Sequence, residues 1–178
     1  RGLGDVYKRQ LQHHRQHAHK HQHQNQHQTS TSTSPPASTP TSTSTGIVSV
    51  VGTAGNNTIT TGSGADAITL GTGNDTVTSG AGNDTLSFAT ASLTTDDTIN
   101  GGAGTDTLTS TNAMSLADAD FTNVTNVETI GITTASDNMT LVMGAQTSEA
   151  GISTVTLGTG TNSITVGALH TAALTVNQ

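Results

Sequence analysis

A nine-residue period constrains the fold of this chain more than any other feature of its sequence. Four nonapeptides follow one another without a gap from residue 52: GTAGNNTIT, TGSGADAIT, LGTGNDTVT and SGAGNDTLS. A fifth, GGAGTDTLT, begins at Gly101. Each unit joins a glycine-containing turn to a short run of strand-favouring residues. Repetition at a fixed short period predicts a solenoid, in which each unit packs only on its neighbours.

Three kinds of position carry the chemistry of the repeat. Position two is glycine in four units and position four in all five: Gly62, Gly71, Gly80, Gly102, and Gly55, Gly64, Gly73, Gly82, Gly104. Position six holds Asn57, Asp66, Asp75, Asp84 and Asp106, and position eight holds Ile59, Ile68, Val77, Leu86 and Leu108. Glycine allows a tight turn that exposes backbone carbonyls, and the Asp adds a carboxylate. Converging hard oxygen ligands suit Ca²⁺ better than Mg²⁺. The position-eight side chain is predicted to point inward, with its mostly Thr neighbours outward.

Charge is distributed very unevenly along the chain. All five basic residues lie in the first twenty positions, while residues 21–178 hold eleven carboxylates and no Lys or Arg. Stacked carboxylates at one repeat position, about 4.7–4.8 Å apart, repel one another unless cations lie between them. The same imbalance argues against nucleic-acid binding. The alternative is that Asn and Asp serve only as turn residues that tolerate left-handed backbone and bond their own turn.

The period slips between Ser87 and Gly101. Asp97 and Ile99 lie nine residues before Asp106 and Leu108, and therefore occupy positions six and eight of a degenerate repeat. Asp97 also lies thirteen residues after Asp84, which predicts a four-residue insertion around residues 88–93, with Phe88 plugging or staggering the core. Asp96 is either a further ligand or a solvated neighbour.

These repeats resemble the RTX (haemolysin-type) family, whose pattern is G-G-x-G-x-D-x-U-x. The resemblance implies a right-handed parallel β-roll with two repeats per coil and calcium between turns eighteen residues apart. Asp66 and Asp84 would then share one edge, and Asn57 and Asp75 the other, with the uncharged Asn57 making a weaker site. The ligands implied are the position-six side chains and the turn glycines, namely Asp66, Asp75, Asp84, Asp97, Asp106, Asn57, Gly62, Gly64, Gly71, Gly73, Gly80, Gly82, Gly102 and Gly104.

Composition divides the chain into four segments. Residues 1–10 resemble translated sequencing adaptor, the alternative being a genuine basic tail. Residues 11–45 are His/Gln-rich and then Ser/Thr/Pro-rich, which predicts a disordered tail. The His/Gln run is either genuine or a frameshifted copy of the Ser/Thr linker. Residues 46–109 form the predicted calcium-binding β-roll, and residues 110–178 a degenerate β-solenoid that stops within a strand-like run, which indicates truncation. The fold class expected is all-β.

The degenerate segment is expected to continue the β structure. Residues 123–132, 140–143, 153–157, 162–166 and 172–176 have the composition of short strands, and residues 115–121 that of a helical turn, with Ser115 and Asp118 at capping-box spacing. LGTGTNSIT, from Leu157, is a degenerate repeat with Asn162 at position six. The segment resembles bacterial surface-layer and large RTX-type surface proteins.

Function follows from what is present and what is missing. No G-x-S-x-G, H-E-x-x-H or Cys/His arrangement occurs, so the segment is predicted to be non-catalytic. No apolar run approaches a membrane span. The leading hypothesis is a calcium-binding segment of a secreted or cell-surface bacterial protein, such as a surface layer or adhesin, folded by extracellular calcium. The alternative is the secretion and folding module of an exported RTX-type enzyme or toxin. A His-rich metal-binding protein ranks third. Candidate partners besides calcium are other copies and cell-surface polysaccharide.

Overall fold

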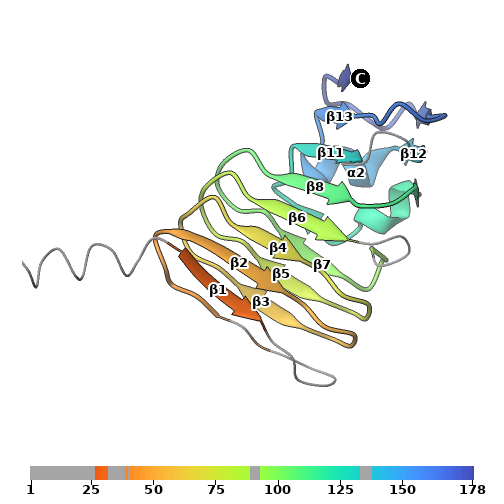
Figure 1. The fold of residues 1–178 in the computed structure, drawn as a ribbon. Helices are drawn as coiled ribbons and strands as arrows, with labels where there is room; N and C mark the ends of the chain where they lie inside the picture. The colour runs from red at the N-terminus through yellow and green to blue at the C-terminus, as the bar shows by residue number, and fades with distance from the viewer. Residues whose placement is uncertain (1–26, 32–38, 40, 89–92, 133–137) are drawn as a thin grey trace, which may run out of the picture.

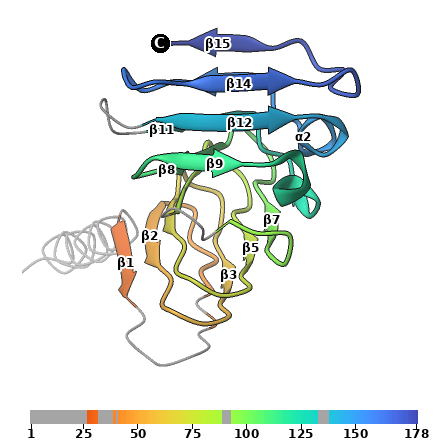
Figure 2. The same ribbon diagram turned by 90° about the vertical axis from the view of Figure 1, so that its right-hand side faces the viewer.

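The computed structural model describes residues 27–31, 39, 41–88, 93–132 and 138–178, which form a parallel β-solenoid. Its elements are β1 (His27–Thr31), β2 (Ile47–Val51), β3 (Thr58–Thr60), β4 (Ala67–Thr69), β5 (Thr76–Thr78), β6 (Thr85–Phe88), β7 (Thr98–Asn100), β8 (Thr107–Ser110), β9 (Met114–Leu116), η1 (Asp118–Phe121), β10 (Val124–Thr125), β11 (Thr129–Ile132), β12 (Met139–Met143), α2 (Ala145–Ala150), β13 (Thr154–Thr156), β14 (Ser163–Val166) and β15 (Thr175–Asn177). Their successive coils stack along one axis (Figures 1 and 2). The all-β expectation is confirmed.

Three parallel sheets make the faces of the solenoid. The longest has eight strands in the order β1-β2-β4-β6-β8-β11-β13-β15, the second runs β10-β7-β5-β3, and the third runs β14-β12-β9. Consecutive strands from β2 to β7 alternate between the first two sheets, so two nonapeptides make one coil. Ile68 pairs with Leu86, and Ile59 with Val77, each partner lying eighteen residues further along. The repeat period therefore becomes the coil length.

The core of the repeat region consists of the position-eight side chains, which stack in rows along the solenoid axis. Ile59, Val77, Leu86 and Leu108 are fully buried and Ile68 is 1% exposed, whereas the first Thr or Ala of each strand faces outward in β3 to β6. Such a narrow core suits small aliphatic side chains, each contributing about 1.5–3 kcal/mol on full burial. The predicted inward position is confirmed.

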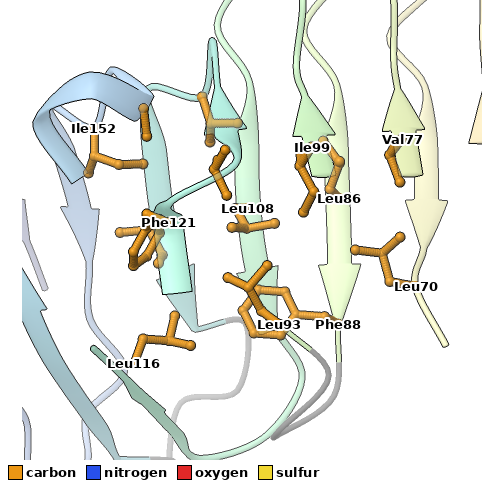
Figure 3. Packing of buried hydrophobic residues seen from close by; sticks show 14 of the residues in the cluster. Leu70, Val77, Leu86, Phe88, Leu93, Ile99, Leu108, Leu116, Phe121 and Ile152 are labelled. Atoms are coloured by element: carbon orange, nitrogen blue, oxygen red, sulfur yellow. The ribbon is translucent and has the colours of Figure 1, made fainter. Parts of the chain in front are cut away.

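The predicted insertion is confirmed by the strand register. Leu86 pairs with Leu108, and Val77 with Ile99, so this coil is four residues longer than its predecessors. The added length lies between β6 and β7 and includes residues 89–92, which are outside the described part of the chain. Phe88 and Leu93 flank the insertion, and both are buried in the core (Figure 3). Their side chains lie beside each other there (Figure 3).

Beyond β8 the coils lengthen and acquire short helices. Ile130 follows its partner Leu108 by 22 residues, and Val155 follows Ile130 by 25. The 3₁₀ helix η1 confirms a helical turn at its four residues, but Ser115 lies in β9 and not at a cap. The Ala117 N–H donates instead to Asp120 (2.9 Å). Strands occur within each predicted range, although residues 123–132 form two strands, β10 and β11, in different sheets, and β15 begins only at Thr175. Helix α2 was not expected.

The amino-terminal region differs in one respect from the sequence-based expectation. β1, inside the segment expected to be disordered, pairs in parallel with β2. Residues 1–26 and 32–38 lie outside the described residues, and the adaptor, frameshift and His-metal hypotheses fall there almost entirely. Within the described residues no helix is long and apolar enough to cross a membrane.

Candidate metal centre

The turns between strands stack into two edges of the solenoid. One edge carries Asp66, Asp84 and Asp106, just before β4, β6 and β8. The opposite edge carries Asn57, Asp75 and Asp97, just before β3, β5 and β7. We call these the first and second edge. Because like-sided turns are eighteen or 22 residues apart, each position-six side chain lies over its equivalent in the next coil. The fold therefore places Asp66 and Asp84 on one edge and Asn57 and Asp75 on the other, as the sequence predicted.

Each position-six carboxylate turns inward and binds the backbone of the preceding coil. On the first edge, Oδ1 of Asp84 accepts the N–H of Asp66 at 2.7 Å, and Oδ1 of Asp106 accepts that of Asp84 at 2.8 Å. On the second edge, Oδ1 of Asp75 accepts the N–H of Asn57 at 2.8 Å. All of these carboxylates are 2% exposed or less. Hydrogen bonds to a charged acceptor are worth about 1.5–3 kcal/mol each, so this ladder ties the coils together.

The second carboxylate oxygen is the unusual feature of the turns. Oδ2 of Asp66, Asp75, Asp84 and Asp106 is buried and accepts no hydrogen bond. An unpartnered buried oxygen of a charged group costs several kcal/mol and calls for a cation or a proton. The four repeats that contain these aspartates therefore each lack a partner for one buried carboxylate oxygen.

Asp97 behaves differently from the other position-six aspartates. Its Oδ1 continues the ladder by accepting the N–H of Asp75 at 2.7 Å, but its Oδ2 accepts the N–H and the hydroxyl of Thr94 at 2.7 and 3.1 Å. The degenerate turn lacks the repeat glycines and supplies its own donors. Its neighbour Asp96 is exposed. Asp97 stays a candidate ligand, but its need for a cation is smaller.

The turn glycines bring backbone carbonyls against the next turn. Gly80 and Gly102 have φ of 94° and 92°, where L-residues are strained, and a Cβ on them would lie 2.0 Å from Gly62 O and 1.9 Å from Gly80 O. Among the described residues no three carboxylate or imidazole side chains come together. A cation here must therefore combine Asp oxygens with these carbonyls. The predicted Gly62, Gly64, Gly71, Gly73, Gly80, Gly82, Gly102 and Gly104 all lie in such turns beside the Asp residues.

Burial and mutual repulsion raise the pKa values of carboxylates on the first edge. The pKa of Asp84 is raised to about 6, chiefly by burial and also by the carboxylates of Asp106 and Asp66, while the hydrogen bond from the Asp66 amide opposes the rise. Burial also raises the pKa of Asp106, with Glu128 contributing. The nearby Ser79 hydroxyl, which donates to Gly101 O at 3.0 Å, also lowers the pKa of Asp84, but its effect is the smallest of these. The metal-free edge therefore favours protonation.

The calcium-free chain is expected to gain β structure as the pH falls from 7 towards 5. The folded-state pKa of Asp84, about 6, lies above its unfolded value of 3.8, so the folded state binds the proton first and acid stabilises it. This contribution is complete below pH 3.8 and is lost as the pH rises through 6. Far-UV circular dichroism in metal-stripped buffer measures it. A signal that does not change between pH 7 and pH 4.5 would contradict the expectation.

Position-five asparagines do not act as left-handed turn residues. Asn126 is the one described non-glycine residue with positive φ (53°). Oδ1 of Asn56 accepts the N–H of Asn74 at 2.9 Å, and Oδ1 of Asn83 accepts that of Thr105 at 3.0 Å. These amides link neighbouring coils on the outer side of the turns. The turn-tolerance alternative therefore does not describe these positions.

Sequence reasoning missed Glu128 as the next member of the first edge. Its Oε2 accepts the N–H of Asp106 at 2.7 Å, which repeats the Asp ladder one coil further on. Glu128 lies 22 residues after Asp106, the spacing that also separates Asp84 from Asp106. Asn126, two residues earlier, takes the left-handed conformation that glycine has in other turns. The 22-residue spacing was the one feature of the sequence that could have predicted the role of Glu128.

Comparison with known proteins agrees with this geometry. Residues 51–86 and 94–111 match the family described as the RTX calcium-binding nonapeptide repeat, in four copies. No curated protein and no solved structure matches the chain. The matched ranges contain both edges, from Asn57 to Asp106, and the four aspartates with unpartnered oxygens. The chain therefore carries calcium-binding RTX nonapeptide repeats, folded as the amino-terminal coils of a parallel β-roll.

Proposed function

We propose that this chain is a non-catalytic segment of an exported or cell-surface bacterial protein, and that calcium bound along its two edges holds its coils together. The observation that carries the proposal is the set of four buried, unpartnered Oδ2 atoms in turns whose glycine backbones stack closely on the carbonyls of the neighbouring turn. Residues 21–178 contain no Lys or Arg that could neutralise them. Calcium accepts six to eight oxygen ligands in flexible geometry, and so suits carboxylates mixed with carbonyls.

Asp118 shows how the same fold treats a carboxylate that needs no metal. It accepts N–H groups of Gly144 (2.7 Å), Thr147 (2.9 Å) and Gln146 (3.2 Å), and also the Thr147 hydroxyl. Burial raises the pKa of Asp118, but these hydrogen bonds outweigh it and hold the pKa below its usual value. The repeat aspartates lack such donors on Oδ2. This difference supports the proposal that the cation binds at the repeats.

Calcium stoichiometry of the full chain tests the proposal, with Asp84→Asn as the informative variant. Asn keeps the Oδ1 that accepts the Asp66 N–H but removes the charge from the unpartnered oxygen. We expect the wild type to bind several Ca²⁺ ions and Asp84→Asn to bind at least one fewer, counted by native mass spectrometry and titration calorimetry.

The matched control for this variant is Asp96→Asn. It removes the same charge from an exposed position and should leave the stoichiometry unchanged. Equal calcium binding by both variants and the wild type would place the ions elsewhere, and a wild type that binds none would refute the proposal.

The wider context of the segment is tested by the complete open reading frame. Further Thr-rich β coils on both sides support a surface-layer or adhesin-like protein. A hydrolase or pore-forming domain beside the repeats supports the exported enzyme or toxin instead. In both cases the low calcium concentration inside cells and the higher concentration outside separate synthesis from folding, since extracellular calcium modules bind at about 10⁻⁴–10⁻³ M.

A further inference from the structure

Two turns of the solenoid carry asparagine at position six. On the second edge, Nδ2 of Asn57 donates to Thr53 O at 2.9 Å and also to Gly55 O. In the degenerate repeat that begins at Leu157, Nδ2 of Asn162 donates to Gly158 O at 2.7 Å and Gly160 O at 3.0 Å. The accepting carbonyls are those of positions two and four in both turns. The same closure thus occurs in two different sheets.

The other amide atom keeps the inter-coil role of the repeat aspartates in one of these turns. Oδ1 of Asn162 accepts the N–H of Met139 from the preceding coil at 2.9 Å, as Oδ1 of Asp84 accepts that of Asp66 at 2.7 Å. Asn57, in the first repeat, instead directs Oδ1 to the N–H of Thr53 at 3.4 Å. Its Nδ2 also donates to Oδ1 of Asp75 at 3.1 Å. What the two asparagines share is therefore the Nδ2 contact with their own turn.

The isosteric atom in the aspartate turns is the unpartnered Oδ2. An NH₂ group presents two partly positive hydrogens to the two carbonyls, whereas a carboxylate oxygen at that place can only be held near them through a cation or proton. We infer that the amide groups of Asn57 and Asn162 replace the calcium ion in their own turns, so that turns 52–57 and 157–162 close without metal. This inference rests on the proposed calcium binding by the aspartate turns.

Whether a given turn requires calcium consequently depends on one side-chain atom at position six, which is Nδ2 in asparagine and Oδ2 in aspartate. The metal-dependent turns are those of Asp66, Asp75, Asp84 and Asp106, and they lie between two turns that are complete without metal. These closed turns hold their coils in register while calcium is scarce, and they give the incoming ions an ordered neighbour on which to build. The sequence-based expectation of a weak calcium site at Asn57 is thereby replaced by a site that needs no calcium.

Asn57→Asp in the full chain tests the inference. It removes both amide hydrogens and places an unpartnered oxygen beside Thr53 O and Gly55 O. We expect it to bind one Ca²⁺ more than the wild type, by native mass spectrometry, and to require a higher calcium concentration to fold. Asn56→Asp adds the same charge one residue away while leaving the Asn57 amide in place, and should bind the wild-type number. Asn162→Asp is the second, independent gain-of-site variant.

Substitutions of an aspartate turn test the same inference if the asparagine variants fail to fold. Asp66→Asn and Asp66→Ala should each bind one ion fewer, but only Asp66→Asn can close its turn with an amide. Its calcium midpoint for folding, followed by circular dichroism, should stay at or below the wild-type value, whereas that of Asp66→Ala should rise. A wild type that binds calcium, with no gain in Asn57→Asp or Asn162→Asp, overturns the inference alone. A wild type that binds none overturns the proposed function as well.

Discussion

Removal of calcium by EGTA is expected to abolish most of the β-sheet signal of the full chain, and millimolar calcium is expected to restore it. At a free concentration ten times Kd, each independent site contributes about 1.4 kcal/mol to the free energy of unfolding, so four sites contribute roughly 6 kcal/mol. This is comparable with the whole stability of a typical domain, about 5–15 kcal/mol. Without calcium, the buried oxygens of Asp66, Asp75, Asp84 and Asp106 remain uncompensated.

Far-UV circular dichroism during a calcium titration measures this coupling. Magnesium at the same concentrations is the matched control, since its octahedral demand suits the mixed carbonyl and carboxylate turns poorly and it should restore little structure. Residues 61–110 should lose their amide-exchange protection first, because they contain the aspartate turns. A β-sheet spectrum that persists unchanged in EGTA would show that the carboxylates are tolerated without metal.

Replacement of Gly102 by Ala is expected to destabilise the calcium-bound protein strongly. The added Cβ would lie 1.9 Å from Gly80 O, and the residue has a φ of 92°. The backbone strain alone costs about 1–3 kcal/mol. Relief of the clash must also move the Gly80 carbonyl, which belongs to the proposed calcium shell, so calcium affinity should fall together with stability.

Urea denaturation in saturating calcium measures the first effect of this substitution, and calorimetry measures the second. Gly167→Ala is the control, because its Cβ would come no nearer than 3.2 Å to Met143 O and its φ is ordinary. We expect a clear drop in the urea midpoint for Gly102→Ala and little change for Gly167→Ala. Equal midpoints would mean that the coils are not packed as closely at this edge as the structure shows.

Much of the amino-terminal solenoid could be predicted because its information is local and periodic. Leu86 and Asp84 occupy fixed places in a nine-residue unit, and two units close one coil, so the strand, the inward side chain and the edge follow from counting. The insertion before Asp97 was also visible as a break in that count, and the register of Val77 with Ile99 confirms its length.

The carboxyl-terminal coils could not be predicted at the same level because their period is lost. The extension of the first edge to Glu128 depends on a coil of 22 residues whose turn uses Asn126 in place of glycine. Ser115 matched a capping pattern, yet pairing with β12 placed it in a strand. Helix α2 forms where Asp118, from the coil before, accepts its first N–H groups. These contacts join residues more than twenty positions apart.

The sequence by itself determined the repeat, the ligand-bearing positions and the absence of Lys and Arg from residues 21–178, since composition and spacing need no knowledge of contacts. Only the tertiary structure decided what each position-six side chain does with its two polar atoms. In the aspartate turns one oxygen binds the preceding coil, and in four of them the other is left buried without a donor. In the asparagine turns an amide closes the turn instead. The reason is physical: a side chain's partners come from neighbouring coils, and the stacking of coils places them.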